Sequence, residues 1–321
     1  MRRLGPAGPQ VPAIGLGCGP MSAGTPDDDT SVATIRAAVD AGIALVDTAD
    51  FYGNGHNEEL LRRALRPGDR EKVVISDKFG GLRDPAGRFI GLDGRPVHVK
   101  SALGYSLQRL GTDHVDIYRP ARLDPAVPIE DTVGAIAEMV QAGWVRHIGL
   151  SEVGAGTIRR AHAVHPIADV QLEYSLFARG IERSILDTCH ELGIGVTAYG
   201  VLAHGLLTGA YEGGGEVGHL PWFNAGNLPA NLALVDRLRP IAAGLGVTVA
   251  QLAIAWVLSR GPAIVALVGA SRPARVASAV DASAIVLSAA DLAAVEAAVP
   301  PGSVAGTRYA KPLMALLDSE R

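Results

Sequence analysis

The chain has 321 residues, of which 48% are hydrophobic and 19% charged, so it is long and apolar enough to bury a large core. Its formal net charge is −4 and it contains no block of like charges, which argues against nucleic acid or an anionic membrane as a partner. A small molecule is therefore the expected partner. The length fits one large α/β barrel or two ordinary domains, and we expect a single domain over residues 1–321.

Two cysteines, Cys18 and Cys189, lie far apart in the sequence and form neither a disulfide framework nor a metal motif. We expect two buried thiols in a reducing compartment, and no metal centre. The first nineteen residues, MRRLGPAGPQVPAIGLGCG, contain prolines and glycines instead of the long apolar run of a signal peptide or a membrane span. These features predict a cytoplasmic protein and leave its oligomeric state open.

Short β-rich runs alternate with amphipathic helical stretches along the whole chain. Eight runs are expected as strands: 13–18, 44–50, 72–79, 114–120, 145–151, 169–175, 194–200 and 263–269. Helical stretches separate them, and those at 29–42, 99–111 and 129–143 each close on a glycine suited to a helix C-cap. This alternation predicts an α/β protein with a parallel sheet, and eight units predict closure into a (β/α)8 TIM barrel.

Two segments depart from the βα alternation. The opening MRRLGPAGPQVPAI has turn residues at its centre and is expected to form a hairpin over the barrel floor. Residues 203–231 are rich in glycine and asparagine and contain Trp222 and Phe223. A long loop with exposed aromatic residues after a barrel strand suits a substrate lid, and a disordered surface insertion is the alternative.

The active site of such a barrel is built from the carboxyl ends of the strands and the loops that follow. The second strand ends in VDTADFYG, which delivers Asp47 and Tyr52, and the third ends in SDKFG, which delivers Lys78. A buried lysine needs a counter-charge, and Asp47 on the neighbouring strand can supply it. A positive charge close to Tyr52 stabilises the phenolate and makes the tyrosine a usable general acid. Taken singly, each residue is better explained as a turn cap, a loop contact or a solvated side chain than as part of a catalytic site.

Together these motifs closely resemble the aldo-keto reductase family. The resemblance begins with VDTADFYGNGHNEELLRRAL followed by VVISDKFG, and it extends over essentially the whole chain. Further matching segments are SLQRLGTDHVDIY, PIEDTVGAIAEMVQAGWVRHIGLSE, VQLEYSLF, AYGVLAHGLLTG and NLALVDRL. They look most similar to the branch with yeast pyridoxal reductase-like and plant auxin-induced-protein-like members. The resemblance also implies additional C-terminal helices.

The resemblance implies an oxidoreductase that binds NADPH in an extended form, without a Gly-rich dinucleotide fold. It assigns Tyr52 as proton donor, Lys78 as the group that lowers the tyrosine pKa, and Asp47 as partner of Lys78 and part of the cofactor site. Ser151 and Gln171 match positions that hold the nicotinamide carboxamide, and Tyr199 matches the aromatic that stacks on the ring. The other implied cofactor contacts are Gly200, Leu202, Gly205, Gly269, Ser271, Arg272 and Arg275, with the two arginines on the 2′-phosphate.

Several positions depart from the family pattern. Gly200 and Val201 replace a serine-proline pair, Ser278 and Ala279 replace the glutamate-asparagine pair at the adenine, and Glu152 stands where many members have asparagine. The family's catalytic histidine falls at Ala121. That histidine donates a hydrogen bond to the carbonyl oxygen, and its loss is expected to slow carbonyl reduction about tenfold to a hundredfold.

Other residues are candidates for the missing donor. Strand alternation places Arg119 on the same face as Ala121, whereas Arg122 has the opposite parity and is expected in a structural ion pair. The remaining candidates are His147, His204 and His219. We interpret Ala121 as a functional departure that opens space for a bulky substrate, and the alternative is loss of a side chain in a weakly active protein.

The leading hypothesis is transfer of a hydride between NADPH and a carbonyl or alcohol carbon of a small or medium-sized organic molecule. Reduction of a conjugated carbon–carbon double bond and a weakly catalytic, redox-sensing NADPH-binding subunit are the alternatives. The substrate pocket is expected to include Met21, Phe51, Ala121, Trp222 and Phe223, with residues 83–96 and 211–230 in the surrounding loops.

Overall fold

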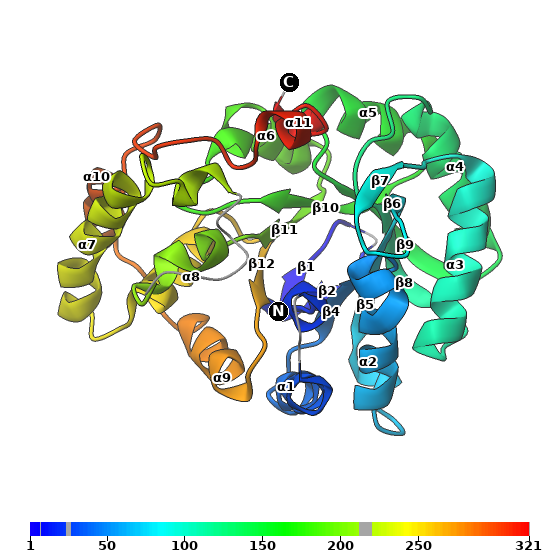
Figure 1. Cartoon of the computed structure of the whole chain (residues 1–321), viewed down its shortest axis with the longest axis horizontal. Helices are drawn as coiled ribbons and strands as arrows, with labels where there is room; N and C mark the ends of the chain where they lie inside the picture. The colour runs from blue at the N-terminus through cyan, green and yellow to red at the C-terminus, as the bar shows by residue number, and fades with distance from the viewer. Residues whose placement is uncertain (7, 24–26, 212–219, 321) are drawn as a thin grey trace.

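The barrel predicted from the sequence is present in the computed structural model, which describes residues 1–6, 8–23, 27–211 and 220–320. Eight parallel strands close into a ring (Figure 1). In chain order they are β3 (Ile14–Gly17), β4 (Leu45–Ala49), β5 (Val74–Phe79), β8 (Val115–Pro120), β9 (Val145–Ser151), β10 (Ile167–Glu173), β11 (Gly195–Tyr199) and β12 (Ile264–Gly269). Each strand begins and ends within two residues of its expected bounds, so the sequence-based fold is confirmed.

Helices follow the strands and surround the ring (Figure 1). They are α1 (Asp28–Asp40), α2 (His56–Ala64), α3 (Pro96–Leu110), α4 (Ile129–Gln141), α5 (Ala155–Val164), α6 (Ile185–Glu191), α7 (Leu228–Gly244), α8 (Val249–Ser259) and α9 (Pro273–Ala282). The C-terminal additions are α10 (Ala289–Ala298) and α11 (Lys311–Met314). Short 3-10 turns complete the description: η1 (Gly19–Ser22), η2 (Tyr52–Gly55), η3 (Arg70–Lys72), η4 (Gly180–Arg183), η5 (Ala203–Thr208), η7 (Pro221–Phe223) and η8 (Asp318–Glu320).

Local sequence signals explain where several helices begin and end. Asp27 caps α1 by accepting from the backbone N–H groups of the second and third residues after it, and Thr248 forms a capping box with Gln251 at the start of α8. The three glycines expected as helix stops, Gly42, Gly111 and Gly143, all adopt a left-handed conformation with φ between 66° and 83°. The sequence therefore fixes these helix ends directly.

The floor of the barrel is closed by the N-terminal hairpin, as expected. Its strands β1 (Arg2–Arg3) and β2 (Gln10–Val11) are antiparallel. Leu4 lies fully buried in a small cluster with residues from the amino ends of the barrel strands, among them Leu45 and Val265. The Arg2 guanidinium donates to the Leu258 carbonyl at 2.9 Å, which ties the hairpin to the end of α8. The hairpin therefore seals the end opposite the expected site.

A second hairpin, which the sequence analysis did not predict, follows β5. Its strands are β6 (Gly81–Arg83) and β7 (Phe89–Leu92). Asn54 in the turn after β4 donates to the Asp84 carbonyl at 3.2 Å, so the hairpin lies beside the loops at the carboxyl end of the barrel. The expected substrate loop at 83–96 thus has regular structure of its own.

The segment expected to form a lid differs from the prediction where it is described. Trp222 and Phe223 are 1% and 7% exposed, so the expectation of exposed aromatic residues is wrong. Trp222 packs edge-on against Phe177, with ring centroids 5.9 Å apart, and Phe223 packs against Tyr211 at 5.2 Å. Large aromatic rings gain more from burial than a solvated loop can offer, and the neighbouring loops supply the cover. Residues 212–219 of the expected lid lie outside the described residues.

Two further observations concern the thiols and the longest apolar helices. Cys18 and Cys189 are both buried, as expected, and burial raises the pKa of each thiol. In the described part of the chain, no single helix is long and apolar enough to cross a membrane. Only α7 and α8 taken together meet that test, and they are bent by 88° at the break between them.

Candidate active site

Tyr52 stands at the carboxyl end of the barrel, in the turn that follows β4. The three residues after it, in the sequence GNG, adopt left-handed backbone with φ of 59°, 53° and 98°. Glycine and asparagine adopt this conformation at the least cost, so the sequence itself specifies the turn. The tyrosine ring packs edge-on against Phe51 with centroids 5.1 Å apart, and a side chain at Gly19 would approach the ring within 3.2 Å. The ring is therefore confined between the first two βα loops.

Lys78 and Asp47 form a buried ion pair between neighbouring strands β5 and β4, directly beside Tyr52. Their side chains are 4% and 3% exposed. The Lys78 ammonium also donates to the Thr48 carbonyl at 2.8 Å, and it lies 4.9 Å from the centroid of the Tyr52 ring. Burial lowers the pKa of Lys78, but the negative charge of Asp47 and the hydrogen bond to it outweigh this effect and raise the pKa above its ordinary value. The lysine is therefore a permanent cation next to the phenol.

Asp47 is held by two more donors. The Ser76 hydroxyl and the Gln171 side-chain amide donate to its second carboxylate oxygen at 2.8 Å and 2.7 Å. Gln171 comes from β10, so the network extends across the ring. Ser151 at the end of β9 is 1% exposed, and its hydroxyl has no hydrogen-bond partner among the described residues. The structure thus gathers five of the predicted site residues at one end of the barrel and leaves the buried Ser151 hydroxyl without a partner in the part of the chain that it describes.

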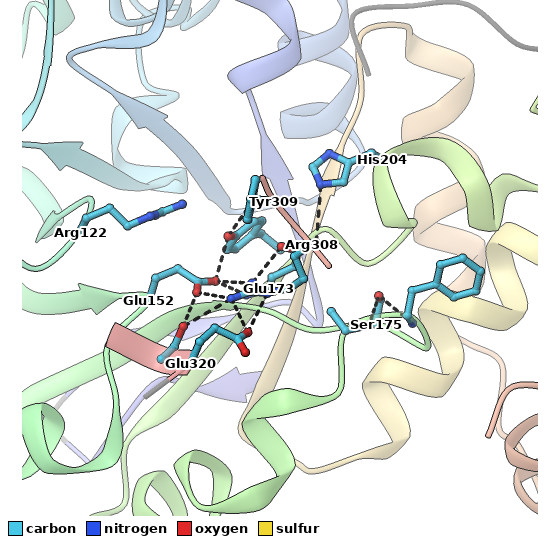
Figure 2. A network of polar contacts seen from close by, with 12 residues as sticks. Arg122, Glu152, Glu173, Ser175, His204, Arg308, Tyr309 and Glu320 are labelled. Carbon is cyan, nitrogen blue, oxygen red and sulfur yellow. Dashed lines mark hydrogen bonds and ion pairs between the residues drawn. The ribbon is translucent and has the colours of Figure 1, made fainter. Parts of the chain in front are cut away.

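A polar network that the sequence analysis did not predict lies beside this group (Figure 2). The Arg308 guanidinium donates to the carboxylates of Glu152, Glu173 and Glu320 at 2.8–3.0 Å. Glu152 is fully buried and has a left-handed φ of 52°, which costs a non-glycine residue about 1 kcal/mol. Burial raises the pKa of Glu152, but Arg308 outweighs it and lowers the pKa to about 2. The carboxylate therefore stays ionised.

The C-terminal segment also places an aromatic residue in the site. The hydroxyl of Tyr199, the expected nicotinamide-stacking residue, donates to Glu152 at 2.8 Å and lies 3.3 Å from the hydroxyl of Tyr309. The Tyr309 ring packs edge-on against His204 with centroids 6.3 Å apart. No sequence motif identified Arg308 or Tyr309, because they follow the last helix that the barrel pattern requires. The only feature of the sequence that pointed to these two residues is that a basic and an aromatic residue stand side by side in a segment without a regular pattern.

The remaining expected cofactor residues lie on two loops at the same end. After β11, Gly200, Ala203, His204 and Gly205 all have left-handed backbone, and a Cβ at Gly205 would meet no atom within 4 Å. After β12, which ends at Gly269, the chain passes through Ser271 into the amino end of α9. Arg272 and Arg275 are exposed there, and the described residues provide neither with an ion-pair partner. Leu202 precedes η5 and is partly buried against the core.

Comparison with known proteins decides the family. A model of the aldo/keto reductase family matches residues 13–300. The chain belongs to the aldo-keto reductase family. A probable aldo-keto reductase from Glycine max is 38% identical, over 96% of this chain and 91% of that protein.

Solved structures give the same result for the fold. A glycerol dehydrogenase from Gluconobacter oxydans superimposes with a TM-score of 0.85 and 30% identity, over 96% of this chain and 99% of that chain. An aldo-keto reductase from Klebsiella pneumoniae in complex with NADPH has a TM-score of 0.76 and 29% identity, over 97% and 99% of the two chains. The present aldo-keto reductase is therefore an oxidoreductase.

Ala121, where the sequence analysis places the family's histidine, directly follows the end of strand β8. The Ala121 backbone N–H donates to the Phe79 carbonyl at 2.8 Å, which continues the pairing of β8 with β5, and its side chain is 4% exposed. Arg119 is fully buried and donates to Asp169 at 3.0 Å. His147 lies near the amino half of β9, beside Ile117 of β8, and His204 lies 3.6 Å from Glu173. His219 lies outside the described residues.

The expected ion pair of Arg122 is not formed. No carboxylate in the described part of the chain lies within ion-pair distance of its guanidinium, which donates to the Ala121 carbonyl at 2.6 Å. The parity argument failed because β8 ends at Pro120 and the chain bends at the next two residues, so strand alternation no longer sets the side-chain direction.

The expected pocket residues have different surroundings. Met21 is fully buried in the core, and Phe51 is half-buried beneath Arg83, whose guanidinium lies 5.9 Å from the ring centroid. Trp222 instead lines a cavity of about 450 Å³ together with Phe177 and Arg308. This cavity lies on the side of the Arg308 network that faces η4, and Tyr52 does not line it. At the expected adenine position, Ala279 is 3% exposed and faces the core.

A cluster of carboxyl groups behind Tyr52 gives a prediction about stability. Asp50 has a buried oxygen without a hydrogen-bond partner among the described residues. Burial, followed by the charge of Glu58, raises its pKa to about 7. The folded state therefore holds a proton that the unfolded state releases near pH 4, so this group lowers the free energy of unfolding as pH rises from about 4 to about 7.

Asp50→Asn removes that titration while keeping the size of the side chain. We expect the variant to be more stable than the wild type at pH 8 by about 2–4 kcal/mol, with little difference at pH 4. Urea unfolding at both pH values measures this. Equal pH dependence in the two proteins would show that Asp50 is ionised throughout. Asp29→Asn, at an exposed carboxylate on α1, is the control.

Proposed function

We propose that this aldo-keto reductase catalyses NADPH-dependent interconversion of a carbonyl compound and an alcohol, with Tyr52 as general acid and base. The observation that carries the proposal is the position of the buried Lys78 ammonium, paired with Asp47 and 4.9 Å from the Tyr52 ring. A buried ion pair beside a half-buried phenol has no evident structural purpose that a hydrophobic pair would not serve better. It does stabilise a phenolate.

Tyr52 delivers the proton in the reducing direction. Its hydroxyl protonates the oxygen of a bound carbonyl as the neighbouring carbon is reduced, and the phenolate so formed remains next to the Lys78 ammonium. An ammonium has three donors, of which Lys78 uses one for Asp47 and one for the Thr48 carbonyl. The third is available to the phenolate oxygen. In the oxidising direction the same phenolate removes the proton of the alcohol.

The residues present fit a nicotinamide cofactor. The unpaired hydroxyl of Ser151 and the side chain of Gln171 offer polar atoms for a carboxamide at the ends of β9 and β10. Gly205 leaves open space where a phosphate group could approach the backbone. When bound, NADPH supplies the hydride, and the related reductase from Klebsiella pneumoniae was solved with NADPH. Tyr199, fixed by Glu152 and Tyr309, would support one face of the ring.

A single-turnover experiment tests the proposal. Purified protein is loaded with NADPH and mixed with an activated aldehyde, a quinone or an enone, and loss of absorbance at the reduced nicotinamide is followed. We expect cofactor oxidation with the aldehyde. Binding of NADPH without oxidation by any carbonyl would identify a binding module, and turnover of the enone alone would identify a double-bond reductase.

The two exposed arginines at the start of α9 are expected to select NADPH over NADH. Only NADPH carries a 2′-phosphate, and Arg272 and Arg275 lie where the helix amino end also favours an anion. The double variant Arg272→Ala/Arg275→Ala should weaken NADPH binding about tenfold or more and NADH binding less than twofold. Fluorescence titration with each cofactor measures this.

The control removes two arginines elsewhere with the same change in charge. Arg159 and Arg160 are exposed on α5 and pair with Glu191 and Glu130. The variant Arg159→Ala/Arg160→Ala should bind both cofactors as the wild type does. Equal losses for NADPH and NADH in the α9 variant would contradict the assignment.

A further inference from the structure

The end of β8 lacks a hydrogen-bond donor at the position nearest the reacting groups. Ala121 follows β8 directly, and its backbone N–H continues the pairing with β5 through a bond to the Phe79 carbonyl. Two residues earlier, the Arg119 side chain crosses the barrel interior to Asp169 on β10. A methyl group therefore stands at the position where the sequence analysis placed the family's hydrogen-bond donor.

Hydrogen bonds hold the Arg119 guanidinium inside the barrel. Its guanidinium donates to Asp169 at 3.0 Å, to the Ser76 hydroxyl at 3.0 Å and to the Leu150 carbonyl at 3.3 Å. It passes so close to Gly149 that a Cβ there would lie 3.0 Å from its central carbon. Withdrawing it toward a substrate would leave Asp169 buried without a cation, which proteins rarely tolerate. The missing donor must come from elsewhere.

Arg122, unlike Arg119, forms no ion pair with the described residues. It is half-buried, and among the described residues its guanidinium makes one hydrogen bond, to the Ala121 carbonyl at 2.6 Å. Figure 2 shows it extending from the end of β8 toward Glu152 and Tyr309. Burial lowers the pKa of Arg122, but nearby groups, of which Tyr199 and Glu152 contribute most, raise it above its ordinary value. Glu152 already pairs with Arg308 at 2.8 Å.

We propose that Arg122 replaces the missing imidazole by binding the oxygen of the reacting carbonyl together with an adjacent anionic oxygen of the same substrate. This inference rests on the proposed function and narrows its substrate class to 2-oxo carboxylates and the corresponding 2-hydroxy acids. In the reduction, the carbonyl carbon gains a hydride from NADPH, which becomes NADP⁺. The carbonyl oxygen gains the proton of Tyr52, and the carboxylate is unchanged.

The chemistry of guanidinium explains the choice of substrate. A neutral imidazole offers one hydrogen bond to a carbonyl oxygen, whereas guanidinium is always charged and presents parallel N–H groups that match two oxygens. A 2-oxo carboxylate presents two such oxygens side by side, one on the carbonyl and one on the carboxylate. It also supplies the negative charge that Arg122 lacks among the described residues. The carbonyl oxygen becomes more negative during reduction, which strengthens its bond to the cation.

Benzoylformate and its methyl ester make a matched pair of probes, because they differ only in the anionic oxygen. We expect the wild type to prefer the acid, with higher kcat/KM and tighter binding to the enzyme–NADP⁺ complex by calorimetry. Arg122→Gln should lower kcat/KM for the acid about 30- to 100-fold and for the ester about tenfold or less. Arg122→Lys should fall between the wild type and Arg122→Gln for the acid, because it keeps the charge but not the paired geometry.

Three controls make the outcome specific. Arg160→Gln, an exposed arginine on α5, should behave as the wild type with both probes. NADPH affinity and melting temperature should be unchanged in Arg122→Gln, since the residue forms no ion pair in the described fold. Adding Ala121→His to Arg122→Gln should recover reduction of the ester more than that of the acid, because an imidazole restores the carbonyl donor alone.

Two results would overturn the inference. The first is a wild type that binds and reduces the ester as well as the acid or better. The second is an Arg122→Gln variant that loses no more with the acid than with the ester. In both cases oxidation of NADPH by other carbonyls would leave the proposed function standing. Absence of oxidation by every carbonyl, with calorimetric binding of benzoylformate still dependent on Arg122, would instead refute the proposed function and leave Arg122 only as a binding group for 2-oxo carboxylates.

Discussion

Replacement of Tyr52 by phenylalanine is expected to lower carbonyl turnover about 100- to 10,000-fold while NADPH affinity stays within twofold of the wild type. The substitution keeps the ring that packs against Phe51 and beside Gly19, so the loop around it should not move. It removes only the hydroxyl that would carry the proton. Stopped-flow measurement of NADPH oxidation, with a fluorescence titration for affinity, separates the two effects.

A matched tyrosine elsewhere provides the control for this substitution. Tyr105 on α3 is 61% exposed, and Tyr105→Phe should leave both turnover and NADPH affinity unchanged. If Tyr52→Phe kept more than a tenth of the wild-type turnover, the acid would have to be another group. The proposed role of Lys78 would then fail with it, because the ammonium acts through the phenol.

Loss of Arg308 is expected to cause the largest change in stability. Arg308→Met leaves Glu152 and Glu173, both buried, without the cation that neutralises them. Removing one partner of a buried ion pair typically costs about 3–5 kcal/mol, and here two carboxylates lose their partner. We expect the free energy of unfolding at pH 7 to fall by at least this amount, as measured by urea denaturation. Arg160→Met, which breaks an exposed pair with Glu130, should have little effect.

The pH dependence identifies the cause of that loss. The folded protein holds the pKa of Glu152 at about 2, below its ordinary value of 4.5, so the stabilisation is complete above pH 4.5 and lost as pH falls toward 2. The difference between the wild type and Arg308→Met should therefore shrink on acidification over this interval. A constant difference from pH 7 to pH 2 would mean that Arg308 stabilises through packing and not through charge.

The sequence predicted the parts of this molecule that follow from periodicity. Eight β-rich runs alternating with helical ones led to the barrel, because apolar strands have to be buried and the helices between them provide the cover. The rule that sites form at the carboxyl ends of strands then selected Asp47, Tyr52 and Lys78, and the structure brings these three together. The prediction of the fold held because it depends on local patterns, whereas the catalytic roles of the three residues stay predictions.

Predictions failed where contacts between distant segments decide the outcome. Arg308 meets Glu152 across 156 residues of sequence, and no pattern relates the two positions. Trp222 was expected in water because it belongs to a long loop rich in glycine and asparagine, but Phe177 covers it in the folded chain. Arg122 was assigned by strand parity, although β8 had already ended at Pro120. For Arg308 and Trp222 the three-dimensional neighbours were unknown, and for Arg122 the alternation rule was applied beyond the end of the strand.

The late position of Arg308 has a consequence for how the enzyme is made. Glu152 and Glu173 leave the ribosome 156 and 135 residues before the arginine that neutralises them. While the chain is still being translated, the upper ends of β9 and β10 therefore carry two carboxylates that must stay hydrated or protonated. Domains fold as they emerge from the ribosome, so the strands of the barrel can assemble before the Arg308 network at their carboxyl ends forms. The two carboxylates can then be neutralised only after residue 308 has been added to the chain.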